Sequence, residues 1–391
     1  MSEAQASTLI KELDNGNWTV RNVEEKIVNS NPKPPFTTST LQQEAARKLR
    51  SSAKKTMRDA QQLYEKGFIT YMRTDSTSLS EEGINGARNL ILKKYGDGYL
   101  PSTSKRYSTK VKNAQEAHEA IRPAGINFAT REKVQQSLDN DTARLYDLIL
   151  KRTLASQMKS AKIKRVSVSI ENGKTLFKAN GKVILFPGYM AAYVESSDKR
   201  NPSHDDQETI LPPLKQGELL NCERLLPNEH QTKPPARFTE ASLVKELESK
   251  GIGRPSTWAN TIDTIVRRTY VMRNQGKLTP TFLGMAVTQL LENHFNSLVD
   301  SKFTAEMENR LDAISRGELD SIPFMKDFYF GNKDNIGLEK MLHEKFPYTK
   351  KTLLPTLEVD KPIEDDQFNL MFEKKFYNNN LWPAKRKKHQ Y

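Results

Sequence analysis

The sequence predicts a multidomain fold that mixes α-helices and β-strands. Helical periodicity dominates most of the chain, whereas a period of two begins at Lys162 and marks a strand-rich block. Proline-rich breaks at 31–35 and 231–237 divide the chain where neither pattern continues. A length of 391 residues is enough for about two to four domains with a substantial core. We therefore expect mainly helical domains joined by a β-rich one.

Helical stretches recur through the first 161 residues. Apolar or small side chains recur at helical spacing over 41–64, and Thr40 is the expected N-cap of this stretch. It forms one helix or two, and a break would lie at Ser51-Ser52. Gly67 suits the C-terminal stop, because glycine adopts a left-handed backbone conformation at little cost. Further helices are expected at 81–95, with Ser80 as N-cap, and at 141–161.

The strand-rich block follows from Lys162 onward. Apolar and polar side chains alternate over 162–170, residues 171–174 have the composition of a hairpin turn, and 175–179 is the expected return strand. Additional strands are expected at 182–185 and 219–225, with the polar stretch 195–209 as a mobile loop between them.

The last strong block of sequence is helical again. Thr239 is expected to cap a helix that ends at Gly251, and Pro255 suits the first position of the next helix. The amphipathic pattern over 303–314 predicts one more helix, and we interpret its charged side chains as a solvated face without chemistry.

Composition restricts the class of protein. A formal net charge of +13 favours a polyanionic partner such as nucleic acid, although a merely basic protein would share this charge. No apolar run is long enough to cross a bilayer, and the N-terminus lacks the features of a signal peptide. Cys222 alone forms neither a disulfide framework nor a multi-cysteine zinc site. We expect an intracellular protein without a membrane partner.

Residues 67–76 carry the strongest chemical signal. If Phe68–Met72 is extended, then Tyr71, Arg73 and Asp75 line one side of the strand, because side chains alternate. A phenol can attack the phosphorus of a phosphodiester while a guanidinium neutralises charge on its non-bridging oxygens. A phenol with a pKa of about 10 needs such a cation nearby. The alternative is a buried strand with an ordinary surface salt bridge.

Two further motifs carry polar side chains that suit phosphate binding. In the first, His118 lies among acidic residues, but no second His or Cys stands at ligand spacing, so we reject zinc; a structural His in a helical turn is the alternative. In the second, Gly251-Ile-Gly-Arg254 leads into a helix whose N-terminal N–H groups would bind phosphate, with Arg267-Arg268 a helix length further on. A simple tight turn is the alternative there.

These motifs resemble those of the type IA DNA topoisomerases, the bacterial topoisomerase I kind. The strings are Ile69-Thr-Tyr-Met-Arg-Thr-Asp-Ser76, Glu116-Ala-His-Glu-Ala-Ile-Arg-Pro123 and the block 237–257, and the resemblance runs from about Pro34 to about Leu338. It implies an isomerase in which Tyr71 becomes joined to a 5′ phosphate of cut single-stranded DNA, with Arg73 as its electrostatic partner. It further implies that DNA is held by His118, Arg254, Thr257, Arg268, Gln61 and Glu65.

The resemblance also implies an architecture. In this family four domains form a torus with a central hole for DNA, and the tyrosine domain lifts away to open a gate. The corresponding parts would be the end of the arch or a connecting segment at 1–30, the tyrosine domain at 31–158, the β-rich arch at 159–236, the helical DNA-binding base at 237–330 and a C-terminal extension with a basic tail at 331–391. Trp258 stands where the family commonly has Tyr and would offer an aromatic plane for stacking on a base.

The chain departs from the family pattern at its N-terminus. Type IA enzymes begin with a Toprim domain whose acidic residues bind Mg²⁺, and only 70 residues precede Tyr71 here. The pair Asp139 and Asp141 lies at a helix start, where capping explains it, so we assign no metal site to this chain. The zinc ribbons common in the family are also missing. We therefore expect a central fragment that binds single-stranded DNA and needs a Toprim domain, in cis or on a separate chain, for Mg²⁺-dependent cleavage.

Two alternatives to a topoisomerase part remain open. One is a catalytically silent DNA-binding remnant. The other is a tyrosine recombinase or type IB topoisomerase, which also uses Tyr, Arg and His on a phosphodiester; in those families the tyrosine follows its arginines, whereas Tyr71 precedes most of the basic residues here. The resemblance favours a chromosome-associated protein of the cytoplasm.

Overall fold

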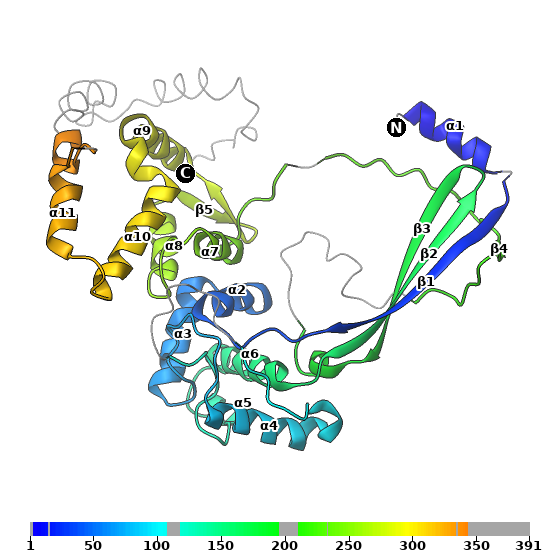
Figure 1. Cartoon of the computed structure of the whole chain (residues 1–391), viewed down its shortest axis with the longest axis horizontal. Helices are drawn as coiled ribbons and strands as arrows, with labels where there is room; N and C mark the ends of the chain where they lie inside the picture. The colour runs from blue at the N-terminus through cyan, green and yellow to red at the C-terminus, as the bar shows by residue number, and fades with distance from the viewer. Residues whose placement is uncertain are drawn as a thin grey trace, which may run out of the picture. The chain divides into compact units, whose positions relative to one another are not determined.

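The computed structural model describes residues 3–14, 16–107, 118–194, 210–232, 234–333 and 335–342. The chain divides into two compact units, Met1–Glu308 and Asn309–Tyr391. Helices and strands alternate in blocks along the chain, as Figure 1 shows by colour. The predicted mixed, multidomain fold is thereby confirmed.

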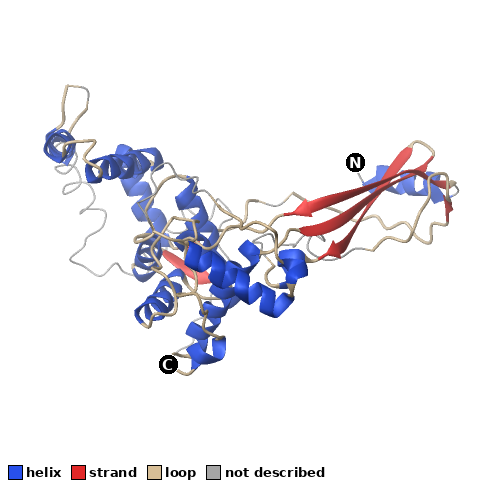
Figure 2. Ribbon diagram, turned by 60° about the horizontal axis from the view of Figure 1, so that its bottom comes forward, coloured by secondary structure: helices blue, strands red, loops and turns tan. Residues whose placement is uncertain are grey.

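A long antiparallel sheet forms the β-rich part of the first unit. It contains β1 (Trp18–Ser30), β2 (Ala161–Asn172), β3 (Thr175–Phe186) and the short β4 (Leu219–Leu220), in the order β3-β2-β1-β4. Figures 1 and 2 show the three long strands side by side. Few of their side chains are buried, among them Val20, Ile163 and Val168. The backbone ladder therefore contributes more to this sheet than a hydrophobic core does.

The sheet differs in three respects from the prediction. The separate strands expected at 175–179 and 182–185 are one strand, β3, which pairs with β2 along its whole length. The strand expected at 219–225 is only two residues long, because it pairs only with Trp18 and Thr19. The sequence did not predict β1, which pairs with β2 from Thr19 opposite Glu171 to Ser30 opposite Ala161. The expected mobile loop 195–209 lies outside the described residues.

The helical core of the first unit is built around α6 (Asn140–Gln157). Tyr146 and Ile149 of α6 are fully buried and share one hydrophobic cluster with Phe36, Leu41 and Leu63. The surrounding elements are α2 (Thr38–Leu49), α3 (Ala53–Glu65), α4 (Glu81–Tyr95), the 3₁₀ turns η1 (Asp97–Tyr99) and η2 (Gly188–Ala191), and α5 (Arg131–Gln135). This core supports the segment that carries Tyr71, because Met72 and Ile69 belong to the same cluster.

Helix boundaries in this core follow the expected stop signals, with two corrections. The break at Ser51-Ser52 is confirmed: Arg50 has a left-handed backbone and the Ser52 side chain caps α3. The predicted N-cap of α2 is wrong, because Thr37 caps the helix and Thr40 is the third residue of the capping box. The helix expected to reach Ala161 ends at Gln157, because Ala161 begins β2.

A second, smaller helical cluster follows the sheet. It contains α7 (Glu240–Ser249), α8 (Trp258–Arg267), the hairpin β5 (Val271–Asn274) and β6 (Lys277–Pro280), and α9 (Phe282–Val299). Thr239 caps α7 as predicted. The expected helix start at Pro255 is wrong, because Pro255 to Thr257 form a turn and α8 begins at Trp258. Helices α10 (Ser301–Ser315) and α11 (Ser321–Phe330) follow further along the chain.

Candidate active site

Tyr71 lies on an irregular segment immediately after α3. Ile69 makes a single antiparallel bridge with Pro123, and the Thr70 N–H donates to the Arg122 carbonyl at 2.9 Å. The expected regular strand Phe68–Met72 is wrong, because the Met72 carbonyl accepts from the Thr38 hydroxyl at 2.8 Å instead of joining a strand ladder. The start of α2 therefore holds the backbone that carries Tyr71.

Burial nevertheless alternates along this segment as predicted. Met72 and Thr74 are buried, whereas Tyr71 and Arg73 are exposed and Asp75 is half-buried. Tyr71 exposes 37% of its surface. Arg73 forms no ion pair within the described part of the chain, so its guanidinium is available to a phosphate.

Two aromatic rings lie close to the ring of Tyr71. The ring centroid of Tyr64 is 5.3 Å away at an interplanar angle of 71°, and the His118 ring is 5.7 Å away at 42°. His118 is exposed and lies in a non-helical stretch, so the expected helical turn is wrong for 118–120. The structure therefore brings the predicted nucleophile and the predicted phosphate-holding imidazole together.

Arg122 fixes the segment that presents His118. Its guanidinium is buried and donates to the Glu119 carboxylate at 2.6 Å, to the Ser80 hydroxyl at 3.1 Å and to the Pro123 carbonyl at 2.8 Å. Partial burial raises the pKa of Glu119, but the hydrogen bonds and charge of Arg122 outweigh this and hold that pKa below its usual value. Glu119 thus remains ionised and keeps the buried guanidinium paired.

Gln61 and Glu65 lie one turn apart near the end of α3. The Gln61 amide donates to the Glu65 carboxylate at 2.6 Å, so the two side chains form one polar group beside Tyr64. This arrangement places both predicted DNA-contacting residues on the helix that leads into the Tyr71 segment.

The glycine turn before α8 has the geometry of an anion site. Gly251 and Gly253 both have positive φ angles, of 72° and 74°. The Gly253 N–H donates to the Glu308 carboxylate at 3.2 Å, and the Arg254 guanidinium lies 3.7 Å from the same carboxylate. A carboxylate of α10 therefore occupies the position at which the sequence predicts a phosphate.

The three basic or hydroxyl residues predicted in this region take different positions. The Arg254 guanidinium donates to the Gly253 carbonyl at 2.7 Å and is directed toward its own loop. Thr257 is exposed, and its hydroxyl accepts from the Arg254 N–H at 2.8 Å. Arg268 is exposed at the C-cap of α8. Neither Thr257 nor Arg268 contacts Tyr71 within the described residues.

The stacking role expected for Trp258 is wrong. Trp258 is buried, packs against Val244 and Ile262, and donates its indole N–H to the Ile252 carbonyl at 2.9 Å. This ring stabilises the glycine turn from inside and has no face open to a base.

Contacts between α7 and α2 link the glycine turn to the Tyr71 segment. The Ser39 hydroxyl donates to the Glu248 carboxylate at 2.6 Å, three residues before Gly251. Burial raises the pKa of Glu248, the Ser39 hydrogen bond opposes this, and the nearby charge of Asp75 raises it further. The Ala53 N–H at the start of α3 donates to Glu240 at 2.7 Å. The glycine turn and the Tyr71 segment are thus connected through the first turns of α2 and α3.

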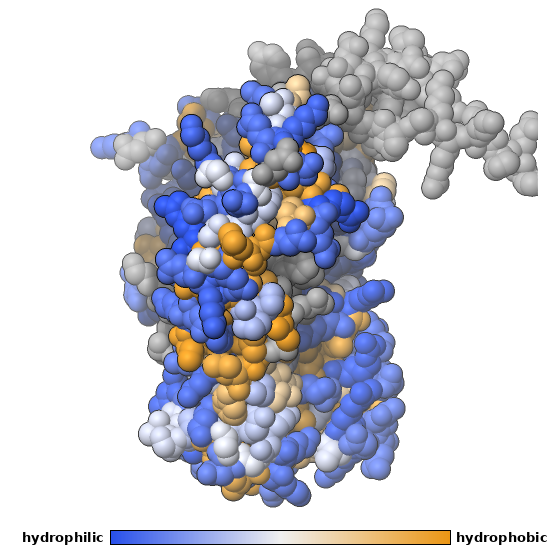
Figure 3. Space-filling view, turned by 90° about the vertical axis from the view of Figure 1, so that its right-hand side faces the viewer, coloured by the Kyte–Doolittle hydropathy of each residue, from blue (hydrophilic) through white to orange (hydrophobic). Residues whose placement is uncertain are grey.

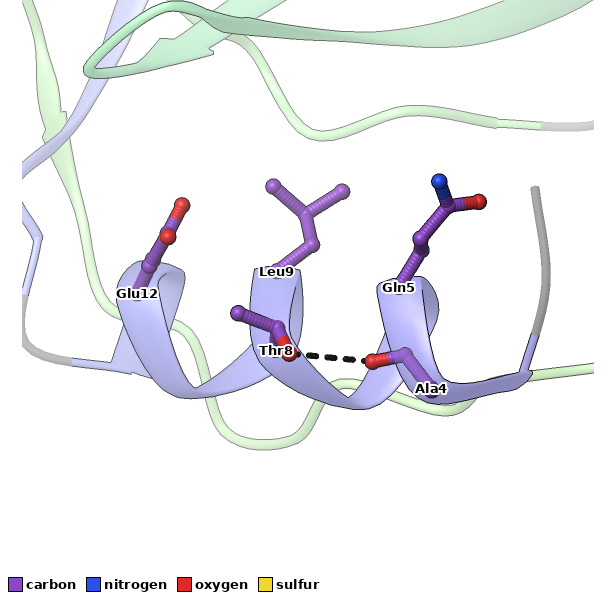
Figure 4. A pocket seen from close by; sticks show the side chains of 5 residues that line it. All are labelled: Ala4, Gln5, Thr8, Leu9 and Glu12. Carbon is purple, nitrogen blue, oxygen red and sulfur yellow. Dashed lines mark hydrogen bonds between the residues drawn. The ribbon is translucent and has the colours of Figure 1, made fainter.

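A hollow beside α1 (Glu3–Asp14) lacks comparable chemistry. Figure 4 shows its lining residues, which come from one helix, with the Thr8 hydroxyl bonded to the Ala4 carbonyl at 3.0 Å. Figure 3 shows a face on which hydrophilic side chains dominate and hydrophobic ones gather only in small groups. None of the described helices is long and apolar enough to span a membrane. The surroundings of Tyr71 therefore remain the candidate site.

Comparison with known proteins identifies the family of this chain. A family model described as DNA topoisomerase matches residues 1–326. The chain belongs to the DNA topoisomerase family. It is 51% identical over 342 residues to DNA topoisomerase 1 of Synechococcus elongatus, covering 88% of this chain and 38% of that protein. It is 49% identical over 360 residues to DNA topoisomerase 1 of a Synechocystis strain, and this match covers 92% of this chain and 40% of that protein.

A solved structure shows the same relationship for this member of the family. Full-length topoisomerase I from Thermotoga maritima matches with a TM-score of 0.68 and 35% identity, covering 88% of this chain and 54% of that one. The chain spans about two fifths of the length of these two curated relatives. The match from residue 1 extends the similarity beyond the expected start at Pro34.

The described residues of this topoisomerase-family chain do not fit a bound Mg²⁺. They bring no three His, Cys, Asp or Glu side chains together as a possible metal site. Asp139 caps α6 by accepting from the Thr142 N–H at 2.7 Å, as expected, and Asp141 pairs with Lys55 at 3.2 Å. Both carboxylates thus have structural partners.

The sequence did not identify several residues that shape the site. Tyr64 stands three positions after Gln61 on α3. Helical spacing places these two residues on neighbouring positions of one face, and this spacing could have identified Tyr64 as part of the site. Ser39 and Glu248 are 209 positions apart. No local pattern relates two residues at that separation, so only the folded chain reveals their contact.

Proposed function

We propose that this chain is the tyrosine-bearing part of a type IA topoisomerase. In this proposal it cuts one strand of DNA through Tyr71, allows a second strand to pass and reseals the cut, relaxing negative supercoils without ATP. The supporting observation is the exposed Tyr71 ring beside His118, with Arg73 exposed on the same side of the segment. Family membership supports DNA as the substrate. A chromosome-associated location in the cytoplasm belongs to the same proposal.

The proposed chemistry conserves the number of phosphodiester bonds. The Tyr71 phenol oxygen attacks phosphorus, the bond from phosphorus to the 3′ oxygen breaks, and the phenol proton ends on the released 3′ hydroxyl. Attack by that hydroxyl reverses the step, so no external energy source is needed. Arg73 and His118 would stabilise the charge that develops on the non-bridging oxygens. Arg254, Thr257, Arg268, Gln61 and Glu65 would hold the flanking backbone.

A Toprim domain, in cis or on a separate chain, is the partner that we propose for Mg²⁺ binding. The described residues of this chain offer no complete site for the ion, so we assign no step to it here. In this proposal, cleavage occurs only when such a partner is present.

Adduct formation on single-stranded DNA tests this function. With a Toprim-containing partner, Mg²⁺ and a 3′-end-labelled oligonucleotide, the unaltered chain should carry the label after denaturation, and Tyr71→Phe should abolish the adduct. Tyr329→Phe is the matched control, since Tyr329 of α11 is similarly exposed and should leave the adduct unchanged. An adduct that survives Tyr71→Phe would exclude Tyr71 as the nucleophile. Label found only with 5′-end-labelled DNA would instead indicate 3′ attachment.

A second candidate is a catalytically silent protein that binds single-stranded DNA. The absence of three clustered metal-ligating side chains within the described ranges favours it. In that case the unaltered chain would bind the oligonucleotide but form no adduct, with or without the partner.

A further inference from the structure

Tyr64 is an exposed aromatic residue beside the nucleophile, and the proposed chemistry leaves it without a role. Helix α3 buries Ala60 and Leu63 completely in the core, whereas Tyr64 and Glu65 are exposed to solvent. Tyr64 exposes 42% of its surface. Burial in the core therefore does not account for a large aromatic side chain at this position.

Contact with Tyr71 accounts for only part of the Tyr64 ring. The two rings meet edge to face, with centroids 5.3 Å apart. The polar pair Gln61 and Glu65 continues the same helix face on either side of Tyr64 in sequence. A flat, partly open ring thus contacts the ring that carries the attacking phenol oxygen, and Gln61 and Glu65 are its polar neighbours on α3.

We propose that Tyr64 is a stacking site for a nucleobase of single-stranded DNA, next to the phosphate that Tyr71 attacks. The proposal rests on the proposed function, because it requires DNA at Tyr71. Every base has a π-face, so an aromatic ring binds single strands with little dependence on sequence. The edge-to-face contact with Tyr71 orients the Tyr64 ring before DNA arrives, which lowers the entropic cost of binding.

Binding of a fluorescent single-stranded oligonucleotide to the whole chain tests the proposal without any cleavage step. Tyr64→Phe retains the ring and should bind within about twofold of the unaltered chain, whereas Tyr64→Leu should bind about tenfold more weakly. The matched control is Tyr329→Leu. Tyr329 is 44% exposed and meets Phe330 edge to face, so this variant loses a comparably exposed ring outside the unit that carries Tyr71 and should bind normally.

Abasic substitutions, scanned along the oligonucleotide, distinguish stacking from a purely structural effect. The unaltered chain should lose affinity at one position, and Tyr64→Leu should show no further loss there. An equal loss in both proteins would overturn the proposal, as would unchanged binding by Tyr64→Leu. If the unaltered chain binds DNA and only the Tyr64 effects are missing, the proposed function stands and this inference fails. If the unaltered chain binds no single-stranded DNA, both fail.

Discussion

Glu248 lies where α7 packs against the start of α2, and the protonation of its carboxylate affects the stability of the fold. Its carboxylate accepts a hydrogen bond from the Ser39 hydroxyl, and the negative charge of Asp75 acts on it electrostatically. Because burial raises the Glu248 pKa, the folded chain holds this proton more tightly than the unfolded chain does. Its contribution to stability is therefore fully present below the ordinary glutamate pKa of 4.5 and is lost as pH rises through the raised pKa.

We expect Glu248→Gln to remove this pH dependence. Relative to the unaltered chain, the free energy of unfolding of the variant should increase as pH rises from about 4 to about 7, because no buried carboxylate then ionises. Urea unfolding at a series of pH values measures the difference. Glu246→Gln, two positions earlier on the same helix and paired with Lys250, is the control. Parallel stability curves for the unaltered chain and Glu248→Gln would contradict the prediction.

Residue-scale inference from sequence was reliable where a side chain acts on its immediate neighbours. The alternation of Tyr71, Arg73 and Asp75 with buried Met72 and Thr74 follows from extended local backbone, even without a regular strand. The expectation for Trp258 was wrong because its burial depends on Val244, which belongs to another helix. The roles of the predicted site residues remain predictions.

At the scale of elements, the first turn of α2 supports the Tyr71 segment directly. The Thr37 side chain caps α2 through the Thr40 N–H at 3.2 Å, and Thr38 donates from its hydroxyl to the Met72 and Thr74 carbonyls at 2.8 and 3.1 Å. The start of one helix thus organises a segment more than 30 positions away.

We expect Thr37→Ala to lower the free energy of unfolding by about 1 kcal/mol, the usual cost of losing an N-cap. The loss should be smaller for Thr40→Ala, because the Thr37 side chain would still accept from the residue 40 N–H. Thermal or urea unfolding of both variants checks the order. A larger loss of unfolding free energy for Thr40→Ala than for Thr37→Ala would contradict this prediction and indicate that Thr40 is the effective N-cap.

Element boundaries in the sequence were accurate where a local signal ends a helix. Gly67 and Gly251 both follow a helix with positive φ, as their lack of a Cβ atom allows. Strand lengths were less accurate, since β3 extends to Phe186 only because β2 is present beside it along its whole length. Hydrogen-bond partners distant in sequence decide where a strand ends.

At the scale of the whole molecule, the formal net charge of +13 governs the proposed binding of DNA. Phosphate contacts by Lys and Arg release counterions, so affinity for single strands should fall linearly with salt on a double-logarithmic plot.

We expect Arg268→Gln to reduce the magnitude of that salt slope by about 0.7, the value for one phosphate contact on a single strand. Fluorescence anisotropy at several salt concentrations measures the slope. Arg316→Gln is the control, because Arg316 already pairs with Glu318 at 2.7 Å. An unchanged slope for Arg268→Gln, or an equal change for the control, would remove Arg268 from the DNA-binding surface.

The sequence by itself determined the family, the mixed fold, the caps of α4, α6 and α7 and the candidate nucleophile. These properties depend on motifs and on interactions between residues close in the chain, such as Asp139 with Thr142. Tertiary structure alone decided that His118 and Tyr64 contact Tyr71, that Glu308 occupies the glycine turn and that Glu248 joins α7 to α2. The physical reason is that such contacts join side chains far apart in sequence, and their geometry exists only once the intervening elements have packed.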